Sequence, residues 1–213
     1  MSDDAAKTIT ARQQIGYAFA VVGLLGVVGA ILIGIRWFVP IATYRVASAS
    51  MEPTLHEGDV VLVKGARELC GSIQPTLGDV AIFRRGDTRY IHRVVAESGQ
   101  TVAMRRGHLV VDGAELPRQA SGERKGEYGR AETVIRETQP NGASYETLDF
   151  GPDGDLDNVA PKRVADGNWF ILGDNRDNAL DSRVLGAVSQ RDVCGVVISI
   201  LSSTEAAHVG RKP

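Results

Sequence analysis

The chain has 213 residues, of which 43% are hydrophobic, and a formal net charge of −2 at pH 7. This length suits one principal domain with an appendage, and the lack of a dense Lys/Arg stripe in the sequence excludes a typical nucleic-acid-binding protein. Abundant glycine (24 residues) and few aromatic residues indicate short strands joined by turns.

An apolar run near the N-terminus is the first predicted element. Residues 1–14 form a polar tail, and residues 15–35 follow without a charged side chain. A run of this length can cross about 30 Å of hydrocarbon as a helix. A removable signal peptide has a shorter apolar core of about 7–15 residues, and the small-x-small site at residues 47–49 lies far beyond the run. We therefore predict a retained transmembrane anchor, whose orientation the nearly balanced flanking charges leave open.

The stretch of residues 46–55, just beyond the apolar run, places Ser48 and Ser50 two residues apart. A residue before proline is restricted to extended backbone, so we expect an extended Glu52 and a bend at Pro53. In an extended stretch the two serines would face the same side. One hydroxyl could then attack a carbonyl while the other donates to the oxyanion. A Ser/Ala-rich linker is the simpler interpretation of these residues alone.

The pattern after Leu55 changes to short apolar runs bounded by turn residues, which indicates strands. These runs are residues 60–63, 80–83, 90–95, 101–105, 108–111, 169–172 and 193–201. Asp112-Gly113 predicts a tight hairpin. We expect a β-domain over residues 36–201, with a mostly polar, exposed insertion at 118–165, followed by a polar tail at 202–213. The two cysteines, Cys70 and Cys194, fit no metal-ligand spacing, and the sequence does not decide whether they pair.

A serine nucleophile needs a base within hydrogen-bond reach and a third group that orients the base. His92 lies mid-strand between apolar neighbours, a position that also suits a core histidine. His56, six residues after Ser50, is a weaker candidate. We expect His108 at the surface beside a predicted hairpin turn, and His208, in the polar tail, is not expected to be the base. His56, His92 and His108 show no metal-ligand spacing, and no glycine-rich phosphate loop follows a strand, so we predict neither a metal nor a cofactor.

A second polar cluster lies in residues 173–183, directly after a predicted buried strand. Its ionisable residues are Asp174, Arg176, Asp177, Asp181 and Arg183. Burial of an unpaired charge is strongly unfavourable, and a surface loop would avoid it. A packed network with pairs of the Asp174–Arg176 and Asp181–Arg183 type would instead support a site, and it explains better why the loop is rich in residues that bond backbone amides.

Taken in order, these motifs resemble the type I signal peptidase family. The resemblance is carried by Ser48-x-Ser50-Met51-x-Pro53-Thr54-Leu55, Gly58-Asp59, Gly78-Asp79-x-x-x-Phe83, Tyr90-Ile91-His92-Arg93-Val94-Val95 and Gly173-Asp174-Asn175-Arg176-Asp177-Asn178-x-x-Asp181-Ser182-Arg183. It implies a mainly β fold, a bent antiparallel β-domain with one N-terminal transmembrane helix. It also implies a membrane-bound serine endopeptidase that removes signal peptides from exported preproteins on the outer face of the cell membrane.

The chain departs from the bacterial form of this family at His92, where the bacterial enzymes usually have lysine and the endoplasmic-reticulum and archaeal forms have histidine. A serine that often helps to hold the lysine is also replaced, by Ala179. A lysine base must have its pKa lowered from about 10.4, whereas histidine, near 6.5, is mostly neutral at pH 7. The histidine instead needs an acceptor for its other ring N–H. Asp181 is our candidate, with Asp174 and Asp177 in reserve.

The expected catalytic residues are therefore Ser50 as nucleophile, His92 as base and Asp181 as orienting acid, with the Ser48 hydroxyl and the Ser50 backbone N–H as the oxyanion site. The expected supporting residues are Asp174, Arg176, Asp177, Arg183 and Arg93. An extended signal peptide could add to a sheet edge, and the resemblance implies pockets for small residues of the Ala-x-Ala type. Met51 and Ile91 are our suggestions for lining these pockets.

Two other functions stay open at this point. The His92 substitution favours a membrane-anchored β-domain that binds extended peptides without cutting them, although the retained Ser48 and Ser50 argue against a decayed site. A specialised processing peptidase for pilus or conjugation substrates would share the same chemistry. A cytosolic self-cleaving repressor-type protease is disfavoured by the apolar run. The expected partners are signal peptides and the lipid bilayer, with the protein-export machinery as a further candidate; nucleic acid is not expected.

Overall fold

The computed structural model describes residues 11–38, 41–65, 70–126, 129, 131–151 and 154–213, and within the N-terminal helix it describes the side chains of residues 16–31. Two compact units, Met1–Pro40 and Ile41–Pro213, make up the chain. The predicted polar tail at residues 1–14 lies mostly outside the described residues.

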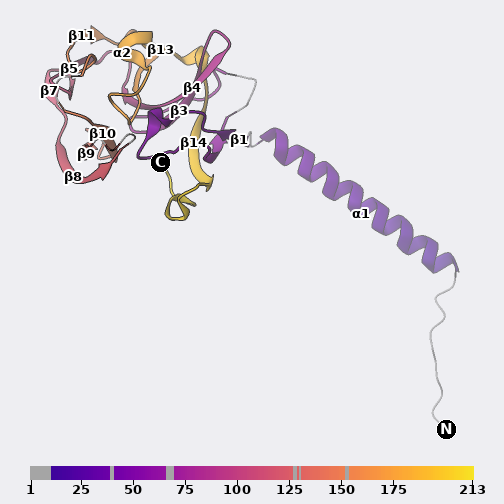
Figure 1. The fold of residues 1–213 in the computed structure, drawn as a ribbon. Helices are drawn as coiled ribbons and strands as arrows, with labels where there is room; N and C mark the ends of the chain where they lie inside the picture. The colour runs from indigo at the N-terminus through magenta and orange to yellow at the C-terminus, as the bar shows by residue number, and fades with distance from the viewer. Residues whose placement is uncertain (1–10, 39–40, 66–69, 127–128, 130, 152–153) are drawn as a thin grey trace. The chain divides into compact units, whose positions relative to one another are not determined.

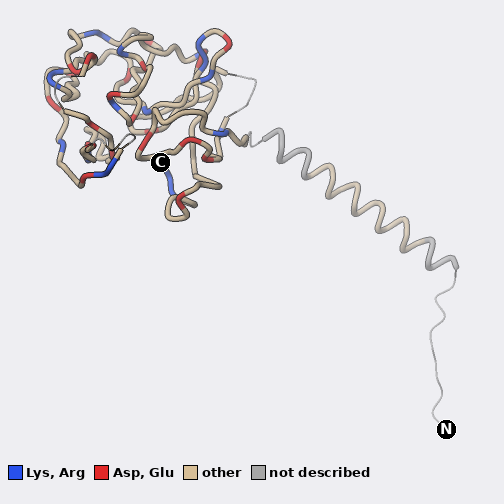
Figure 2. Tube along the Cα trace, viewed as in Figure 1, with Lys and Arg blue, Asp and Glu red and all other residues tan. Residues whose placement is uncertain are grey.

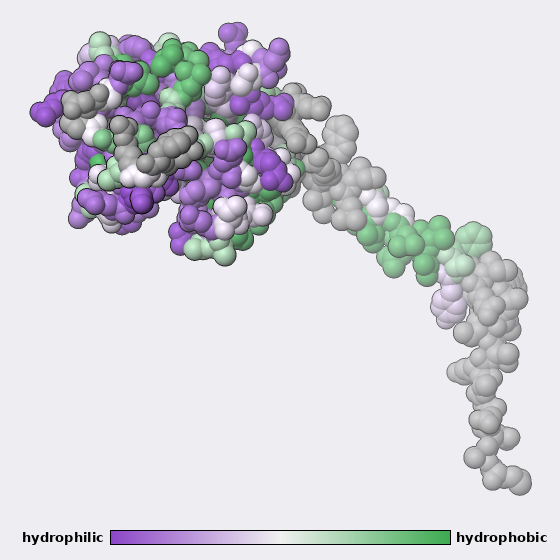
Figure 3. Space-filling model, in the orientation of Figure 1, coloured by the Kyte–Doolittle hydropathy of each residue, from purple (hydrophilic) through white to green (hydrophobic). Residues whose placement is uncertain are grey.

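Helix α1 (Ala11–Phe38) contains the predicted apolar run. Its large apolar side chains from Tyr17 to Ile31 are exposed, and they form the green surface of the helix in Figure 3. Residues 16–31 of α1, whose side chains are described, include no charged residue, as the tan part of the helix in Figure 2 shows. Among the residues described, no helix meets the length and hydropathy required to cross a membrane. The anchor at residues 15–35 therefore stays a prediction.

The second unit is an antiparallel β-domain whose largest sheet has seven strands in the order β1-β2-β14-β3-β4-β12-β13 (Figure 1). The strands are β1 (Ile41–Arg45), β2 (Val60–Lys64), β3 (Val80–Arg85), β4 (Thr88–Ala96), β12 (Asn168–Leu172), β13 (Val188–Ser189) and β14 (Val193–Ser202). Their pairings are antiparallel. The predicted strands in these regions are confirmed, because their apolar runs are buried on this sheet.

A smaller sheet has the order β11-β5-β6-β7. Its strands are β5 (Thr101–Arg105), β6 (His108–Val111), β7 (Ala114–Glu115) and β11 (Val159–Arg163). The hairpin predicted at Asp112-Gly113 is confirmed: it joins β6 to β7, and the φ angles of its two central residues are 51° and 85°. Two positive φ angles are typical of the tight turn that follows the twist of paired strands.

The third sheet, in the order β10-β9-β8, lies within the region predicted as an exposed insertion. Its strands are β8 (Arg118–Lys125), β9 (Ala131–Thr138) and β10 (Ser144–Asp149). The prediction of exposure is wrong for β9 and β10, where Glu137, Tyr145 and Leu148 are buried. The polar composition of this region suggested exposure, but Glu137 is buried because it pairs with Arg176 from another segment. Leu148 also exchanges backbone hydrogen bonds with Asp174 and Arg176, so this sheet holds the polar loop.

Short helices and one disulfide complete the domain. The helices are η1 (Ala49–Met51), α2 (Ser182–Leu185), η3 (Gln190–Asp192) and η4 (Ala206–His208). Cys70 and Cys194 form a disulfide, which resolves the pairing that the sequence left open. Cys194 belongs to the same hydrophobic cluster as Met51 and Leu55. The core therefore lies directly beneath the serine-bearing segment.

Candidate active site

Ser50 lies within η1, and Ser48 precedes this single turn in an extended conformation, with φ −156° and ψ 164°. The prediction that both serines share an extended strand is therefore wrong from Ala49 onward. The backbone N–H of Glu52 donates to the Ala49 carbonyl at 3.1 Å, which closes the turn. Glu52 itself is extended, as expected before a proline. The hydroxyl oxygens of Ser48 and Ser50 nevertheless lie 3.2 Å apart.

The serine turn is anchored from below by apolar side chains. Met51 and Leu55 are both 0% exposed, and Ile91 from β4 is 5% exposed in the same cluster. The suggestion that Met51 and Ile91 line a substrate pocket is therefore not supported, since both pack into the core. Met51, directly after Ser50, fixes the turn, because burial of such a side chain contributes about 1.5–3 kcal/mol.

The polar loop clamps the serine turn from above. Asn175 donates its backbone N–H to the Ser50 carbonyl at 3.1 Å and its Nδ2 to the Ala49 carbonyl at 3.2 Å. Gly173 lies against the same carbonyl: a β-carbon at this position would be 2.6 Å from the Ser50 oxygen and 3.6 Å from Cδ2 of His92. The serine turn and the His92 ring therefore meet around a position that only glycine can occupy.

His92 points from the middle of β4 into this region and is 1% exposed. Its ring lies 5.7 Å from Phe83 and 6.2 Å from Tyr90, measured between centroids. Burial lowers the pKa of His92 to about 4, against the opposing effect of the Asp181 and Asp174 carboxylates. The imidazole is therefore neutral at pH 7 and able to accept a proton.

Asp181 does not form the predicted hydrogen bond with His92. Both Asp181 oxygens are bound by Arg183, with Oδ1 accepting from Nε at 2.9 Å and Oδ2 from Nη2 at 2.8 Å. Oδ2 also accepts the Gly173 N–H at 3.0 Å. His92 Nδ1 is buried and has no hydrogen-bond partner among the described residues. Arg183, two residues along the chain, matches the Asp181 carboxylate with its planar guanidinium group better than the more distant His92 imidazole does. Asp181 therefore acts on His92 through its charge.

The predicted Asp181–Arg183 pair is thus confirmed, and both side chains are 0% exposed. The predicted Asp174–Arg176 pair is wrong. Asp174 instead binds Arg93 through two hydrogen bonds of 2.8 and 2.6 Å. Arg176 binds Glu137 through two hydrogen bonds of 2.8 and 2.5 Å. Each of these buried charges is paired, and the pairs of Asp174 and Arg176 join the loop to other segments, so the loop is packed and is not a solvated surface loop.

The remaining predicted residue of this loop, Asp177, is half-buried. Its carboxylate accepts the Phe150 N–H at 2.8 Å, and burial raises its pKa. Sequence reasoning gave no site role to Thr54, Glu137, Gly173 or Asn175. Thr54 donates to Asp174 at 2.5 Å. Gly173 and Asn175 stand in the quoted motif and were recognisable there, whereas no local signal marks Glu137.

Ser48, Ser50 and His92 line one pocket of about 460 Å³. Its other lining residues are Ala49, Tyr90, Leu156, Asp177, Asn178, Ala179, Leu180 and Val184. Leu180 and Val184 are exposed, so the pocket presents apolar side chains beside the serine and the imidazole. A nucleophile, a neutral base and a second hydroxyl on one partly apolar wall are the groups needed for acyl transfer.

The other histidines lie elsewhere. His108 pairs with Glu115 at the surface, with a distance of 3.3 Å from Nδ1 to the carboxylate, as expected. His56 does not line the serine pocket, which removes the alternative base; it lies beside the C-terminal segment with His208.

The model of the family "Signal peptidase, peptidase S26" matches residues 18–202. A signal peptidase I of Bacillus licheniformis is 32% identical over 176 residues, which cover 81% of each chain. Signal peptidase I S of Bacillus subtilis is 29% identical over 173 residues, again 81% of each chain. A relative from Staphylococcus aureus, named an inactive signal peptidase IA, is 28% identical over 165 residues, 78% of this chain and 80% of its own.

Proposed function

Because this chain belongs to the signal peptidase family, peptidase S26, and is therefore a serine endopeptidase, we propose that it removes signal peptides from exported preproteins by a Ser50–His92 mechanism. The observation that carries the proposal is that Ser50 and His92 line the same pocket, with the Ser50 carbonyl oxygen and Cδ2 of His92 both within 4 Å of where a β-carbon of Gly173 would lie. The Ser50 hydroxyl attacks the carbonyl carbon of the last signal-peptide residue, and His92 takes the hydroxyl proton. His92 then gives this proton to the nitrogen of the departing mature chain as the peptide bond breaks, and water hydrolyses the remaining ester on Ser50.

The environment of His92 suits a base. Its pKa near 4 keeps the ring neutral before the reaction. When the ring accepts the proton, the carboxylates of Asp181 and Asp174 favour the resulting imidazolium, because both charges raise the pKa of His92. Both carboxylates are held in place by arginine partners. Asp181 therefore acts as an electrostatic and positioning residue.

The oxyanion of the tetrahedral intermediate is bound by the Ser48 hydroxyl and the backbone N–H of Ser50. The 3.2 Å between the two serine oxygens brings the Ser48 donor next to the reacting atom. Preorganised donors of this kind contribute about 10²–10³ in rate. The two hydrogen bonds from Asn175 hold the serine turn rigid, which preserves this geometry.

Substrate recognition uses the pocket beside Ser50. We propose that an extended signal-peptide end lies along the domain and places small side chains, of the Ala-x-Ala type, against the pocket wall. Leu156, Leu180 and Val184 replace Met51 and Ile91 as the apolar contacts. Tyr90 also lines this pocket and takes up part of its space, which favours small substrate side chains.

We further propose that α1 anchors the enzyme in the membrane, with the β-domain on the outer face. Support comes from the exposed apolar side chains of the helix and from the disulfide between Cys70 and Cys194. Disulfides persist mainly in oxidising compartments outside the cytosol. A fusion reporter placed after residue 213 should therefore report an extracytoplasmic C-terminus.

The proposal is tested by incubating the full chain in detergent with a preprotein ending in Ala-x-Ala. We expect Ser50→Ala and His92→Ala to abolish cleavage, and His108→Ala, a surface histidine, to leave it unchanged. His92→Lys should cleave only at raised pH, since a lysine must first lose its proton. Near-native cleavage by His92→Ala would refute the Ser–His assignment.

The inactive relative favours one alternative, a domain that binds signal peptides without cutting them. In the same assay this alternative predicts peptide binding by the wild type with no product at any pH. Cleavage that depends on Ser50 excludes it.

A further inference from the structure

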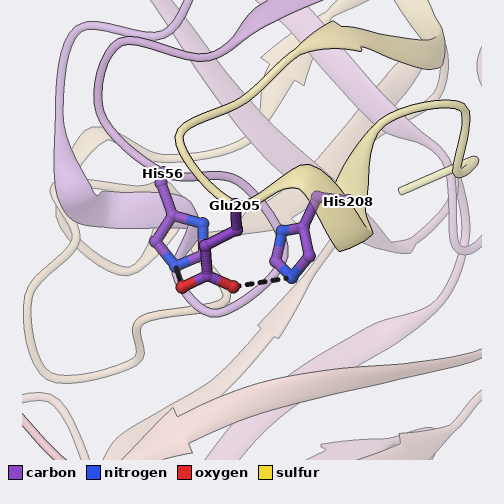
Figure 4. A group of neighbouring side chains, drawn as sticks. All are labelled: His56, Glu205 and His208. Carbon is purple, nitrogen blue, oxygen red and sulfur yellow. Dashed lines mark ion pairs between the residues drawn. The ribbon is translucent and has the colours of Figure 1, made fainter.

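Two histidines and a glutamate that do not line the serine pocket lie close together, as Figure 4 shows. His56 follows the buried Leu55 after the serine turn, and Glu205 and His208 belong to the C-terminal segment after β14. We call His56, Glu205 and His208 the tail cluster. One possible ligand atom from each lies within 4.8 Å of the others. The prediction of no metal site considered only the spacing of His56, His92 and His108, whereas Glu205 and His208 lie about 150 positions after His56.

The distances within the tail cluster match metal ligation. His56 Nε2 lies 3.6 Å from Oε1 of Glu205, and His208 Nε2 lies 3.3 Å from Oε2. A charge-assisted hydrogen bond is shorter, about 2.7–2.9 Å. Four ligands around zinc, with bonds of about 2.0–2.1 Å, are separated by about 3.4 Å along the edges of a tetrahedron. Each imidazole nitrogen therefore lies at about this separation from one of the two Glu205 oxygens.

The backbone already holds the tail cluster in place. The N–H of His56 donates to Asp59 Oδ2 at 2.9 Å. The N–H of His208 donates to the Glu205 carbonyl at 2.9 Å, and Gly210 donates to the Ile200 carbonyl of β14 at 2.8 Å. An ion would thus bind side chains that folding has brought together, with little ordering cost.

We propose that the tail cluster binds one Zn²⁺ ion through the two imidazoles and the carboxylate. Two nitrogen ligands and one carboxylate suit zinc, whereas calcium and magnesium take oxygen ligands. The side chain of Glu205 is 57% exposed and those of both histidines are 16% exposed, so water can occupy the fourth position. The ion joins the segment after the serine turn to the C-terminal segment.

The surroundings set a limit on affinity. Both Nδ1 atoms, of His56 and His208, are buried and have no hydrogen-bond partner among the described residues. When Nε2 binds the metal, the ring proton resides on Nδ1, where a zinc site normally provides an acceptor. The loss of such an acceptor costs about 10–100-fold in affinity for each ring. We therefore expect reversible binding that EDTA removes without unfolding the protein.

The test uses the full chain in detergent, purified through a tag without histidine and treated with EDTA. Zn²⁺ is titrated by calorimetry, and Co²⁺ by its visible absorption spectrum. We expect one ion per chain and, at a hundredfold excess over Kd, a rise in Tm of about 5–10 °C. His56→Ala, Glu205→Gln and His208→Ala should each weaken binding by more than the 10–100-fold of an outer-shell loss.

His108→Ala provides a matched control. His108 also faces a glutamate, Glu115, at 3.3 Å, but it does not belong to the tail cluster. This variant should bind Zn²⁺ like the wild type. The proposal is overturned if the wild type takes up no Zn²⁺, or if the His56→Ala and His208→Ala variants bind it as tightly as the wild type.

Discussion

Substitution of Gly173 by alanine adds a single methyl group at the point where the serine turn, His92 and the polar loop meet. The new β-carbon would lie 2.3 Å from Cβ of Ala179 and 2.6 Å from the Ser50 carbonyl oxygen. Non-bonded carbon atoms prefer about 3.5–4.0 Å, so both neighbours must move by about 1 Å. Overpacking of this kind costs about 1–3 kcal/mol, and a 1 Å displacement of a reacting group costs about 10²-fold in rate.

We therefore expect Gly173→Ala to lower Tm by several degrees and kcat/KM for preprotein cleavage by about 10²-fold. Calorimetry and a fluorogenic signal-peptide substrate measure the two effects. The double variant Gly173→Ala with Ala179→Gly removes the contact at 2.3 Å and keeps the one with the Ser50 oxygen. It should regain much of the stability while its activity stays low.

Gly122 provides the control, because a β-carbon there meets nothing within 4 Å. Gly122→Ala should retain both stability and activity. The reasoning is refuted if Gly173→Ala cleaves at the wild-type rate, or if the double variant recovers activity together with stability.

Four further predictions concern the same site. The pKa of His92, lowered to about 4, places the acidic limb of kcat/KM near pH 4, and a limb near 6.5 would contradict a buried neutral base. Between pH 6.5 and 4 the unfolded chain takes up the His92 proton first, so wild-type stability should fall by about 3 kcal/mol relative to a His92→Asn variant, as measured by urea unfolding at each pH. Ser48→Ala should keep its KM and lose about 10²–10³ in kcat; an unchanged kcat would remove Ser48 from the oxyanion site. Asp174→Asn leaves Arg93 buried without its charge partner. The free energy of unfolding, measured with urea, should fall by about 3–5 kcal/mol. A fall below about 1 kcal/mol, which is typical of an exposed ion pair, would show that solvent reaches the pair.

The local pattern was sufficient for the apolar strands and for the candidate residues, but it missed the polar strands β8, β9, β10 and β11. Alternating and continuous apolar runs depend on neighbours in sequence, so β3, β4 and β14 were predicted close to their observed bounds. The hairpin at Asp112-Gly113 needs only two residues that tolerate positive φ. Ser50 and His92 were identified from their motifs, and the structure places them on one pocket.

Partners that come from distant segments were beyond reach of the sequence. Glu137 of β9 pairs with Arg176, which lies 39 positions away in the sequence. The sequence of β9 is therefore polar although the Glu137 side chain is buried. Asp181 has no free oxygen for His92, because Arg183 and Gly173 already bind both. The serine turn is helical because Asn175 and the core hold it from two sides.

The sequence by itself predicted the apolar strands, named Ser50 and His92 as the candidate pair, and placed a polar loop at residues 173–183 directly after a buried strand. Only the tertiary structure decided which charges pair, which of the polar strands are buried, that Cys70 joins Cys194, and that His56 meets His208. The physical reason is that strand and turn propensity act between neighbours along the chain, whereas ion pairing, burial and ligand geometry depend on distances in space that the folded β-domain alone sets.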